Sequence, residues 1–178
     1  NRKIPMIGMV TRLVEAKGLD LVTRILDELL EYENVQFVIL GTGDRQYEDW
    51  FKGLVWRYPK KVSANIFFNN ELAHQIYAAS DLFLMPSQYE PCGIGQLIAL
   101  RYGTVPIVRA TGGLKDTVEA YNNYTQTGNG FSFNNYNAHE LLFSIKRAID
   151  GIADDRKHIH LVENAMTADY SWEESAKQ

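Results

Sequence analysis

Short apolar runs alternate with segments of helical periodicity along this chain. The apolar runs lie at 5–10, 35–40, 64–68, 81–85 and 105–108, and a shorter one lies at 130–133. Helical patterns lie at 19–32, 45–58, 71–79, 93–102 and 138–150. Continuous apolar runs of this length are typical of strands buried on both faces, and their alternation with helices is typical of a parallel sheet. We therefore predict an α/β fold, a Rossmann-like open parallel sheet of about six strands with helices on both faces.

The C-terminal part of the chain also has a helical pattern, with a break at 169–171. Ser171 and Glu174 have the spacing of a capping box, which predicts a final helix that is cut short at Gln178. With 178 residues and 46% hydrophobic side chains, the chain is long enough for one substantial core and short for two domains. We expect residues 1–178 to form a single domain.

Composition excludes several classes of partner. The net charge is −4, and no basic stripe interleaved with aromatic residues is present, so we expect no nucleic-acid partner. No apolar run approaches the roughly 18 residues of a membrane span, and no charged-then-apolar leader is visible. We expect no membrane partner and a soluble, cytoplasmic protein.

The residues that commonly bind metals are few. Cys92 is the only cysteine, so neither an internal disulfide nor a multi-cysteine metal site can form. The four histidines show no ligand spacing with acidic residues, and we interpret them as surface residues: His74, His139, His158 and His160. The sequence predicts no metal and no cofactor.

The segment 86–97 places a carboxylate beside a glycine-rich helix start. Gly93 and Gly95 let a ligand approach the backbone closely, and the helical pattern begins at about Gly93, so unpaired N–H groups there favour an anion. Glu90 can accept hydrogen bonds from sugar hydroxyls and stabilise positive charge at an anomeric carbon. The segment indicates a site for a sugar joined to phosphates. The alternative is that Glu90 only offsets the helix dipole.

Two cations follow the first predicted strand. Arg12 and Lys17 lie in the loop between the strand at 5–10 and the helix at 19–32, where open parallel sheets form their ligand crevice. They are placed to neutralise a diphosphate, whose charge grows as it departs. A solvated ion-pair patch with Glu15 is the alternative.

Two glycine pairs follow other predicted strands. Gly41 and Gly43 begin like a dinucleotide fingerprint, but position 46 is Gln and the turn does not follow the first strand. We interpret them as a contact on the nucleoside side of a ligand, with a plain glycine turn as the alternative. Gly112 and Gly113, after Thr111, predict a backbone shape open to a ligand.

Two further features of this region carry structural interpretations. Asp116 is expected to cap the turn that follows it. The aromatic loop at 121–130 is expected to be flexible and solvated, although aromatic residues there could also bind a glucan.

The segments at 11–20, 40–44, 86–103 and 106–118 together resemble bacterial glycogen synthases and their plant starch synthase relatives, and the resemblance spans nearly the whole chain. It implies the carboxyl-terminal, nucleotide-sugar-binding domain of a GT-B fold. It also implies a retaining glucosyltransferase that moves glucose from ADP-glucose to the 4-hydroxyl at the non-reducing end of an α-1,4-glucan. The glucan acceptor would arrive through an amino-terminal domain, so we expect this chain alone to have little or no transferase activity.

Position by position, the resemblance implies that Arg12 and Lys17 bind the donor diphosphate and that Glu90 contacts the transferred glucose. Phe68, at the end of the third predicted strand, matches an aromatic residue that stacks on adenine, with ordinary core as the alternative. Cys92 is interpreted as a small residue lining the sugar pocket, with a reactive thiol as the alternative. The other residues expected to bind substrate are Gly93, Ile94, Gly95, Gly41, Gly43, Thr111, Gly112 and Gly113.

The chain departs from many related transferases at two positions. Ile98 stands where many have a second glutamate, which weakens a mechanism with two carboxylates, and Gly95 stands where some have a hydroxyl side chain. The alternatives are a GT-B transferase or phosphorylase that uses a UDP-sugar or glucose 1-phosphate, and a non-catalytic nucleotide-sugar-binding module. No lysine motif for pyridoxal phosphate, which a phosphorylase would need, is visible.

Overall fold

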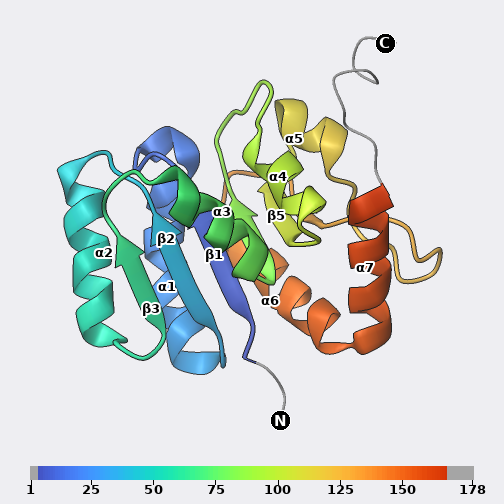
Figure 1. The fold of residues 1–178 in the computed structure, drawn as a ribbon, viewed down its shortest axis with the longest axis horizontal. Helices are drawn as coiled ribbons and strands as arrows, with labels where there is room; N and C mark the ends of the chain where they lie inside the picture. Colours follow the sequence, from blue (N-terminus) through green and yellow to red (C-terminus); the bar gives the residue numbers. More distant parts are fainter. Residues whose placement is uncertain (1–3, 168–178) are drawn as a thin grey trace.

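The computed structural model of the chain describes residues 4–167. Six strands form one sheet in the order β3-β2-β1-β4-β5-β6, and every neighbouring pair is parallel (Figure 1). The strands are β1 (Met6–Val10), β2 (Gln36–Leu40), β3 (Val62–Asn65), β4 (Leu82–Met85), β5 (Val105–Arg109) and β6 (Phe131–Phe133). The predicted open parallel sheet is confirmed.

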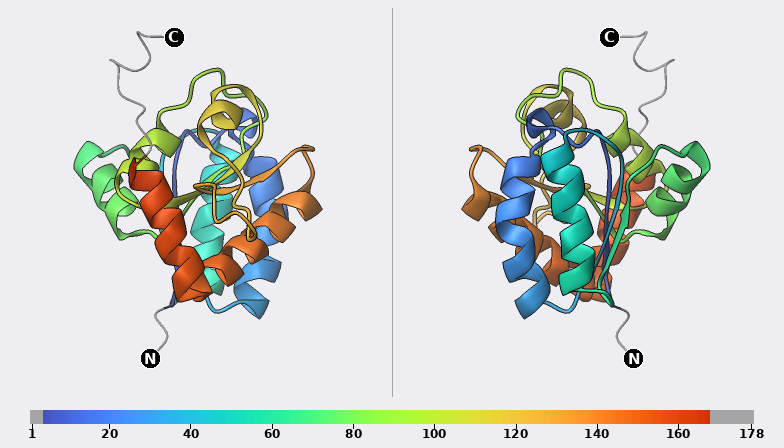
Figure 2. Two further views of the ribbon diagram at one scale, coloured as in Figure 1. Left: turned by 90° about the vertical axis from the view of Figure 1, so that its right-hand side faces the viewer. Right: turned by 90° about the vertical axis from the view of Figure 1, so that its left-hand side faces the viewer.

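Helices cover both faces of the sheet, as predicted. They are α1 (Leu19–Tyr32), α2 (Arg45–Arg57), α3 (Asn70–Ala79), α4 (Gly95–Arg101), α5 (Gly112–Thr117), α6 (Ala138–Ala153) and α7 (Asp155–Thr167), with a short 3₁₀ helix η1 (Glu15–Lys17) before α1. One face is covered by α1, α2 and α6, and the other by α3 and α4, with α7 beside α4 and β5. Figure 2 shows α1 and α2 side by side in its right-hand view.

Alternate residues of a strand serve the two faces. In β2, Phe37 and Ile39 pack into the large core cluster under α1 and α2, whereas Val38 and Leu40 pack with α3 residues on the other side. Because side chains alternate along a strand, a strand covered on both faces must be apolar throughout. This is why the apolar runs identified the strands.

The structure differs from the expected boundaries at two places that matter for the site. Strand β3 ends at Asn65, which is paired with Leu40, the last residue of β2. As an edge strand, β3 has no other partner to extend it, so Phe68 lies in the following loop. Helix α4 begins at Gly95 instead of Gly93, because Gly93 adopts a left-handed conformation (φ 72°) that interrupts a right-handed helix.

Residues 112–117 form the short helix α5, which is not among the helices predicted from the sequence. Asp116 is an exposed residue within α5, so its predicted role as the cap of the following turn is wrong. Segment 121–130 is closed at its base by a hydrogen bond from Tyr121 N to Gly130 O (2.9 Å), while Tyr124 at its tip is exposed. Residues 122–127 of the loop are therefore solvated as expected, whereas Tyr121 and residues 128–130 are buried and the two ends are bonded together.

Helix α7 confirms the helical pattern up to Thr167, and the predicted break and capping box at 169–174 lie outside the described residues. None of the helices in residues 4–167 combines the length and apolar character that crossing a membrane requires.

Leu26 on α1 provides a test of this packing. Its side chain is fully buried in the core cluster between α1 and the sheet, so Leu26→Ala should lower the free energy of unfolding by about 2–5 kcal/mol. Arg24→Ala, on the exposed side of the same helix, should change it by less than about 0.5 kcal/mol. Urea unfolding followed by circular dichroism measures both. An equal loss of unfolding free energy in the two variants would contradict the assignment of the Leu26 side of α1 to the core.

Candidate functional site

A cavity of about 230 Å³ opens at the carboxyl ends of the central strands. Strand β1 lies between β2 and β4, so the order of the strands reverses there, and the loops after β1 and β4 border the opening. The polar residues of its lining are Thr11, Arg12 and Lys17 after β1, Ser87 and Glu90 after β4, and Tyr77 on α3. The fold thus brings together the three residues that the sequence singled out for chemistry.

Lys17 and Glu90 form an ion pair inside this cavity. Lys17 Nζ lies 2.8 Å from Glu90 Oε2, and the two side chains are 32% and 14% exposed. Ser87 donates a second hydrogen bond to the same carboxylate oxygen at 3.3 Å. Arg12 is exposed and has no side-chain partner among the described residues. Lys17 is therefore paired with Glu90 and not with Glu15. Arg12 is free to bind an anion.

Direct contacts hold the two site loops together. Gln88 N donates to Ala16 O at 3.0 Å, which joins the backbone of the loop after β4 to that of the loop after β1. Gly18 adopts a left-handed conformation (φ 85°), and a Cβ there would lie 2.2 Å from Pro86 O. Only glycine allows this approach. The distance between Lys17 and Glu90 thus depends on two tightly packed loop backbones.

A second network supports these loops from β5 and from the loop after β6. Arg109, the last residue of β5, donates to the carbonyl oxygen of Gln88, and its guanidinium carbon lies 5.7 Å from the centre of the Tyr136 ring. Tyr136 in turn donates its hydroxyl hydrogen to Asp20, in the first turn of α1. Burial, and then this hydrogen bond, raise the pKa of Tyr136, so its hydroxyl remains a donor at neutral pH. The network links the loop after β4 to the first turn of α1, which directly follows the loop after β1.

Four of the expected ligand-binding glycines pack against the site loops. A Cβ on Gly41 would lie 1.8 Å from Thr11 O, and one on Gly43 would lie 2.4 Å from Leu13 O. Across the cavity, a Cβ on Gly112 would lie 2.2 Å from Glu90 O, and one on Gly113 would lie 2.0 Å from Cys92 O. These four glycines let neighbouring segments press against the loops that carry Arg12 and Glu90, and they lie outside the cavity lining.

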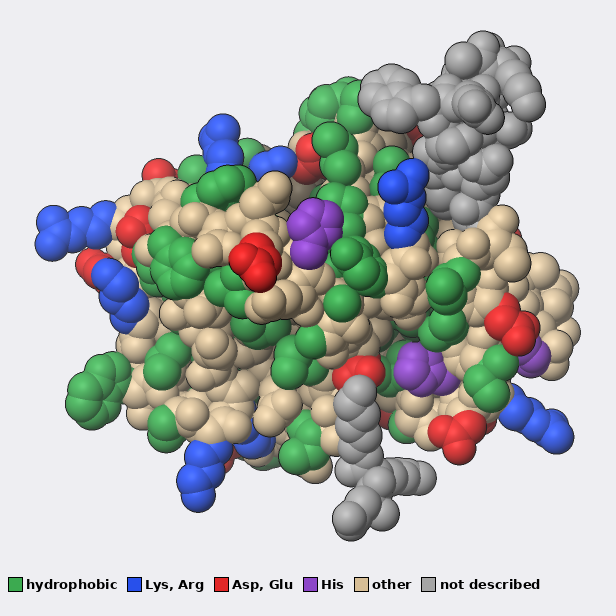
Figure 3. Space-filling model, in the orientation of Figure 1, with side chains coloured by type: hydrophobic (Ala, Val, Ile, Leu, Met, Phe, Trp, Pro, Cys, Tyr) green, Lys and Arg blue, Asp and Glu red, His purple; other side chains and the backbone are tan. Residues whose placement is uncertain are grey.

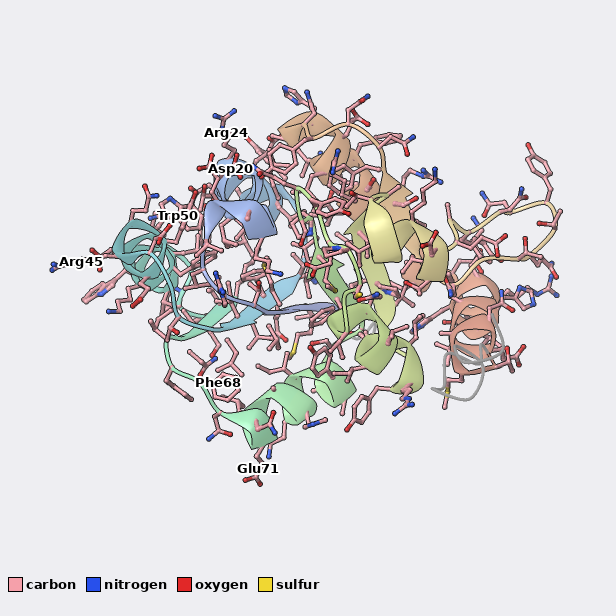
Figure 4. All side chains as sticks on the ribbon, turned by 90° about the horizontal axis from the view of Figure 1, so that it is seen from above. Asp20, Arg24, Arg45, Trp50, Phe68 and Glu71 are labelled. Atoms are coloured by element: carbon pink, nitrogen blue, oxygen red, sulfur yellow. The ribbon has the colours of Figure 1, made fainter. Side chains whose placement is uncertain are left out.

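The remaining expected residues divide into two groups. Gly93, Ile94 and Gly95 line the cavity, whereas Phe68, Cys92 and Thr111 do not. Phe68 is 83% exposed, so the alternative that it belongs to the core is wrong. Figure 4, seen from above, shows Phe68 in the loop that leads into α3, away from Asp20 at the start of α1. Cys92 is exposed, and Thr111 immediately precedes α5.

Sequence reasoning missed Thr11, Ser87 and Tyr77 in the cavity, and Arg109 and Tyr136 behind it. Tyr77 belongs to the apolar face of α3, a pattern that indicates core, and Tyr136 lies in no recognisable motif. The other three lie within the segments that carry the resemblance, where no role was assigned to them. Among the histidines, His74 and His139 are exposed as expected, whereas His158 and His160 are half-buried. The Nδ1 atom of His160 lies 3.4 Å from the Tyr121 hydroxyl. Residues 4–167 contain no group of three or more His, Cys, Asp or Glu side chains arranged to hold a metal.

Comparison with known proteins places the chain in a family. Residues 1–166 match the family model described as glycosyl transferases group 1, and the chain belongs to that family. The chain is 60% identical over 178 residues to the glycogen synthase of Clostridium novyi (strain NT), and 61% identical over 175 residues to that of Alkaliphilus metalliredigens (strain QYMF). These matches cover 100% and 98% of the chain. The chain spans 37% of the length of each of these relatives.

A solved structure agrees with this result. The catalytic domain of starch synthase IV from Arabidopsis thaliana, bound to ADP and acarbose, superposes with a TM-score of 0.90 and is 38% identical. This match covers 100% of the chain and 37% of the plant protein chain. The resemblance to glycogen and starch synthases and the GT-B type of domain are confirmed.

Tyr136→Phe tests the supporting network. Losing a hydrogen bond to a carboxylate should lower the free energy of unfolding by about 1–3 kcal/mol at pH 7. Because folding raises the pKa of Tyr136 above its ordinary value of 10.0, the wild type has the full contribution below pH 10 and loses it as pH rises through the higher folded value. Urea unfolding from pH 7 to pH 11 should show a smaller alkaline loss in the variant.

The matched control is Tyr124→Phe, because Tyr124 is 98% exposed and its hydroxyl has no partner among the described residues. The free energy of unfolding of this control should match that of the wild type at pH 7 and at pH 11. A Tyr136→Phe protein as stable as this control would show that the bond to Asp20 contributes nothing.

Proposed function

We propose that this chain is the donor-binding domain of a glycogen synthase, which transfers glucose from ADP-glucose to the non-reducing end of an α-1,4-glucan with retention of configuration. The observation that carries the proposal is that Arg12, Lys17 and Glu90 line one cavity, although Lys17 and Glu90 are 73 positions apart. The identity of about 60% to bacterial glycogen synthases supports the reaction class. The ADP bound to the related starch synthase supports an adenine nucleotide.

The charges of the cavity suit a diphosphate. Two cations and one carboxylate line it, so its side chains have a net positive charge. The guanidinium of Arg12 can bind two oxygens at once, and it needs to break no existing contact to do so. Lys17 can bridge the incoming anion and Glu90. As the bond between glucose and ADP breaks, negative charge gathers on the diphosphate, and both cations stabilise it more strongly than in the bound donor.

Glu90 acts on the sugar in this proposal. Its carboxylate is mostly buried and is oriented by Lys17 and Ser87, both of which contact the same oxygen. The other oxygen is then available to accept a hydrogen bond from a glucose hydroxyl. A fixed carboxylate also stabilises the positive charge that develops at the anomeric carbon. The backbone of Gly93, Ile94 and Gly95 lines the same cavity and would contact the donor.

The rim of the site, by which we mean the exposed hydrophobic residues in the loops after β3 and β4, supports the remaining parts of the proposal. The exposed ring of Phe68 is free to stack on an adenine base. Tyr89 and Ile94 are also exposed, by 67% and 69%. Figure 3 shows hydrophobic side chains running from the top of the molecule, where the loop after β4 lies, down over α4. We propose that another domain covers this rim and supplies the glucan groove.

Calorimetric titration with ADP, UDP and ADP-glucose tests the donor assignment. The wild-type chain should prefer ADP to UDP. Arg12→Ala should weaken ADP binding by about tenfold or more, because it removes the free cation of the cavity. Glu90→Gln should bind ADP at least as well as the wild type, because it removes a competitor for Lys17, but it should lose any additional affinity for ADP-glucose.

Arg24→Ala is the matched control, because it removes an exposed cation from α1 outside the cavity lining. Equal binding of ADP in Arg12→Ala and in this control would refute the proposed diphosphate site. A preference for UDP would favour the alternative of a transferase that uses a UDP-sugar.

The transferase activity of the chain alone provides a second test. With radiolabelled ADP-glucose and glycogen, the chain should show little or no turnover, because the acceptor groove belongs to the other domain in this proposal. Turnover comparable to that of a full-length glycogen synthase would show that the chain binds and aligns the acceptor itself.

A further inference from the structure

Tyr77 reaches the cavity from α3 and is held firmly in place. Its side chain is 6% exposed, and its ring lies 4.7 Å, centre to centre, from that of Phe83 in β4. Its backbone carbonyl accepts a hydrogen bond from the Thr104 hydroxyl. The ring therefore has little freedom to turn, and the position of its hydroxyl is set by the fold.

The Tyr77 hydroxyl has no hydrogen-bond partner among residues 4–167. Among the described residues, the side-chain atoms that are fully enclosed and lack a partner are Ser80 Oγ, Gln96 Oε1 and Arg109 Nε. The Tyr77 hydroxyl is not one of these atoms, so it is not fully enclosed. A Cβ on Gly95 would lie 3.3 Å from this hydroxyl, so the missing side chain at position 95 leaves it uncovered. Because Tyr77 lines the cavity and is otherwise buried, its hydroxyl is accessible from the cavity.

The other hydroxyls of the cavity are already engaged. The Thr11 hydroxyl donates to the carbonyl oxygen of Arg12 at 3.1 Å, and the Ser87 hydroxyl donates to Glu90. Burial raises the pKa of Tyr77 to about 12, so the group is a neutral donor at physiological pH. A hydroxyl at the wall of a cavity exchanges hydrogen bonds with water in the unliganded protein, so it is free to donate to a ligand that brings an acceptor.

The chemistry of the neighbouring side chains identifies the acceptor. The cavity has a net positive charge. Apart from the second oxygen of Glu90, which is assigned to the sugar, the cavity's side-chain groups without a described partner are the Arg12 guanidinium and the Tyr77 hydroxyl, and both can donate. Within the donor assigned above, the diphosphate is the part that carries negative charge. We propose that the Tyr77 hydroxyl donates a hydrogen bond to a phosphate oxygen of the nucleoside diphosphate. This inference rests on the proposed function and adds a binding residue to it.

The test compares Tyr77→Phe with the wild type by calorimetric titration with ADP, ADP-glucose, inorganic pyrophosphate and adenosine. Loss of a hydrogen bond to a charged acceptor should weaken binding of ADP and pyrophosphate by about tenfold or more. Adenosine, which has no phosphate, should bind equally to both proteins. The melting temperature of unliganded Tyr77→Phe should stay close to that of the wild type, because the variant removes no hydrogen bond within the described part of the protein.

Tyr47→Phe is the matched control. Tyr47 on α2 is 7% exposed and its hydroxyl also lacks a hydrogen-bond partner among the described residues, but it does not line the cavity. This variant should bind ADP and pyrophosphate like the wild type. The comparison separates a contact with the ligand from the general effect of losing a buried phenol.

Three results would overturn the inference. One is an ADP affinity of Tyr77→Phe within twofold of the wild type. Another is a loss confined to ADP-glucose, which would place the hydroxyl against the sugar. The third is a lower melting temperature with unchanged affinities, which would mean a purely structural role. A wild-type chain that binds pyrophosphate but not ADP-glucose would refute the proposed function, while the pyrophosphate comparison would still test Tyr77.

Discussion

Strand β1 pairs in parallel with β2 on one side and with β4 on the other, and the location of the site depends on this arrangement. Parallel strands need a crossover helix between them, and helices therefore cover both faces of the sheet. The order of the strands reverses beside β1, so the loops after β1 and β4 border an opening that the packed helices leave free. The polar side chains that line the cavity lie around this opening.

Close backbone packing converts that opening into a defined site. Gly18 lies against Pro86, and Gly113 donates its N–H to Glu90 O at 2.9 Å, so segments that are distant in sequence meet without side chains between them. Arg109 and Tyr136 then connect the two site loops to β5 and to α1 through polar contacts. Each loop is short, yet its position is determined by several elements together. This is the arrangement expected where charged groups must be held at fixed distances.

The polar groups of the cavity fall into two sets. Lys17, Glu90 and Ser87 satisfy one another, which lowers the cost of removing charges from water. Arg12 and Tyr77 have no such partners among the described residues. The paired set preserves the geometry of the carboxylate, and the unpaired set retains its capacity to bind an anion. A protein that used all of its polar groups internally would be more stable and would bind less.

The sequence by itself determined the sheet, most helix boundaries and the residues Arg12, Lys17 and Glu90, because strand burial and glycine-rich turns leave local patterns. It did not determine the end of β3, the helix α5, or the roles of Tyr77, Arg109 and Tyr136. Strand β3 ends where its neighbour β2 ends, and the glycines of the site pack against segments far away in the chain. Whether a tyrosine on an apolar helix face is core or faces a cavity depends on what stands opposite. These properties belong to contacts between distant segments, and only the tertiary structure decides them.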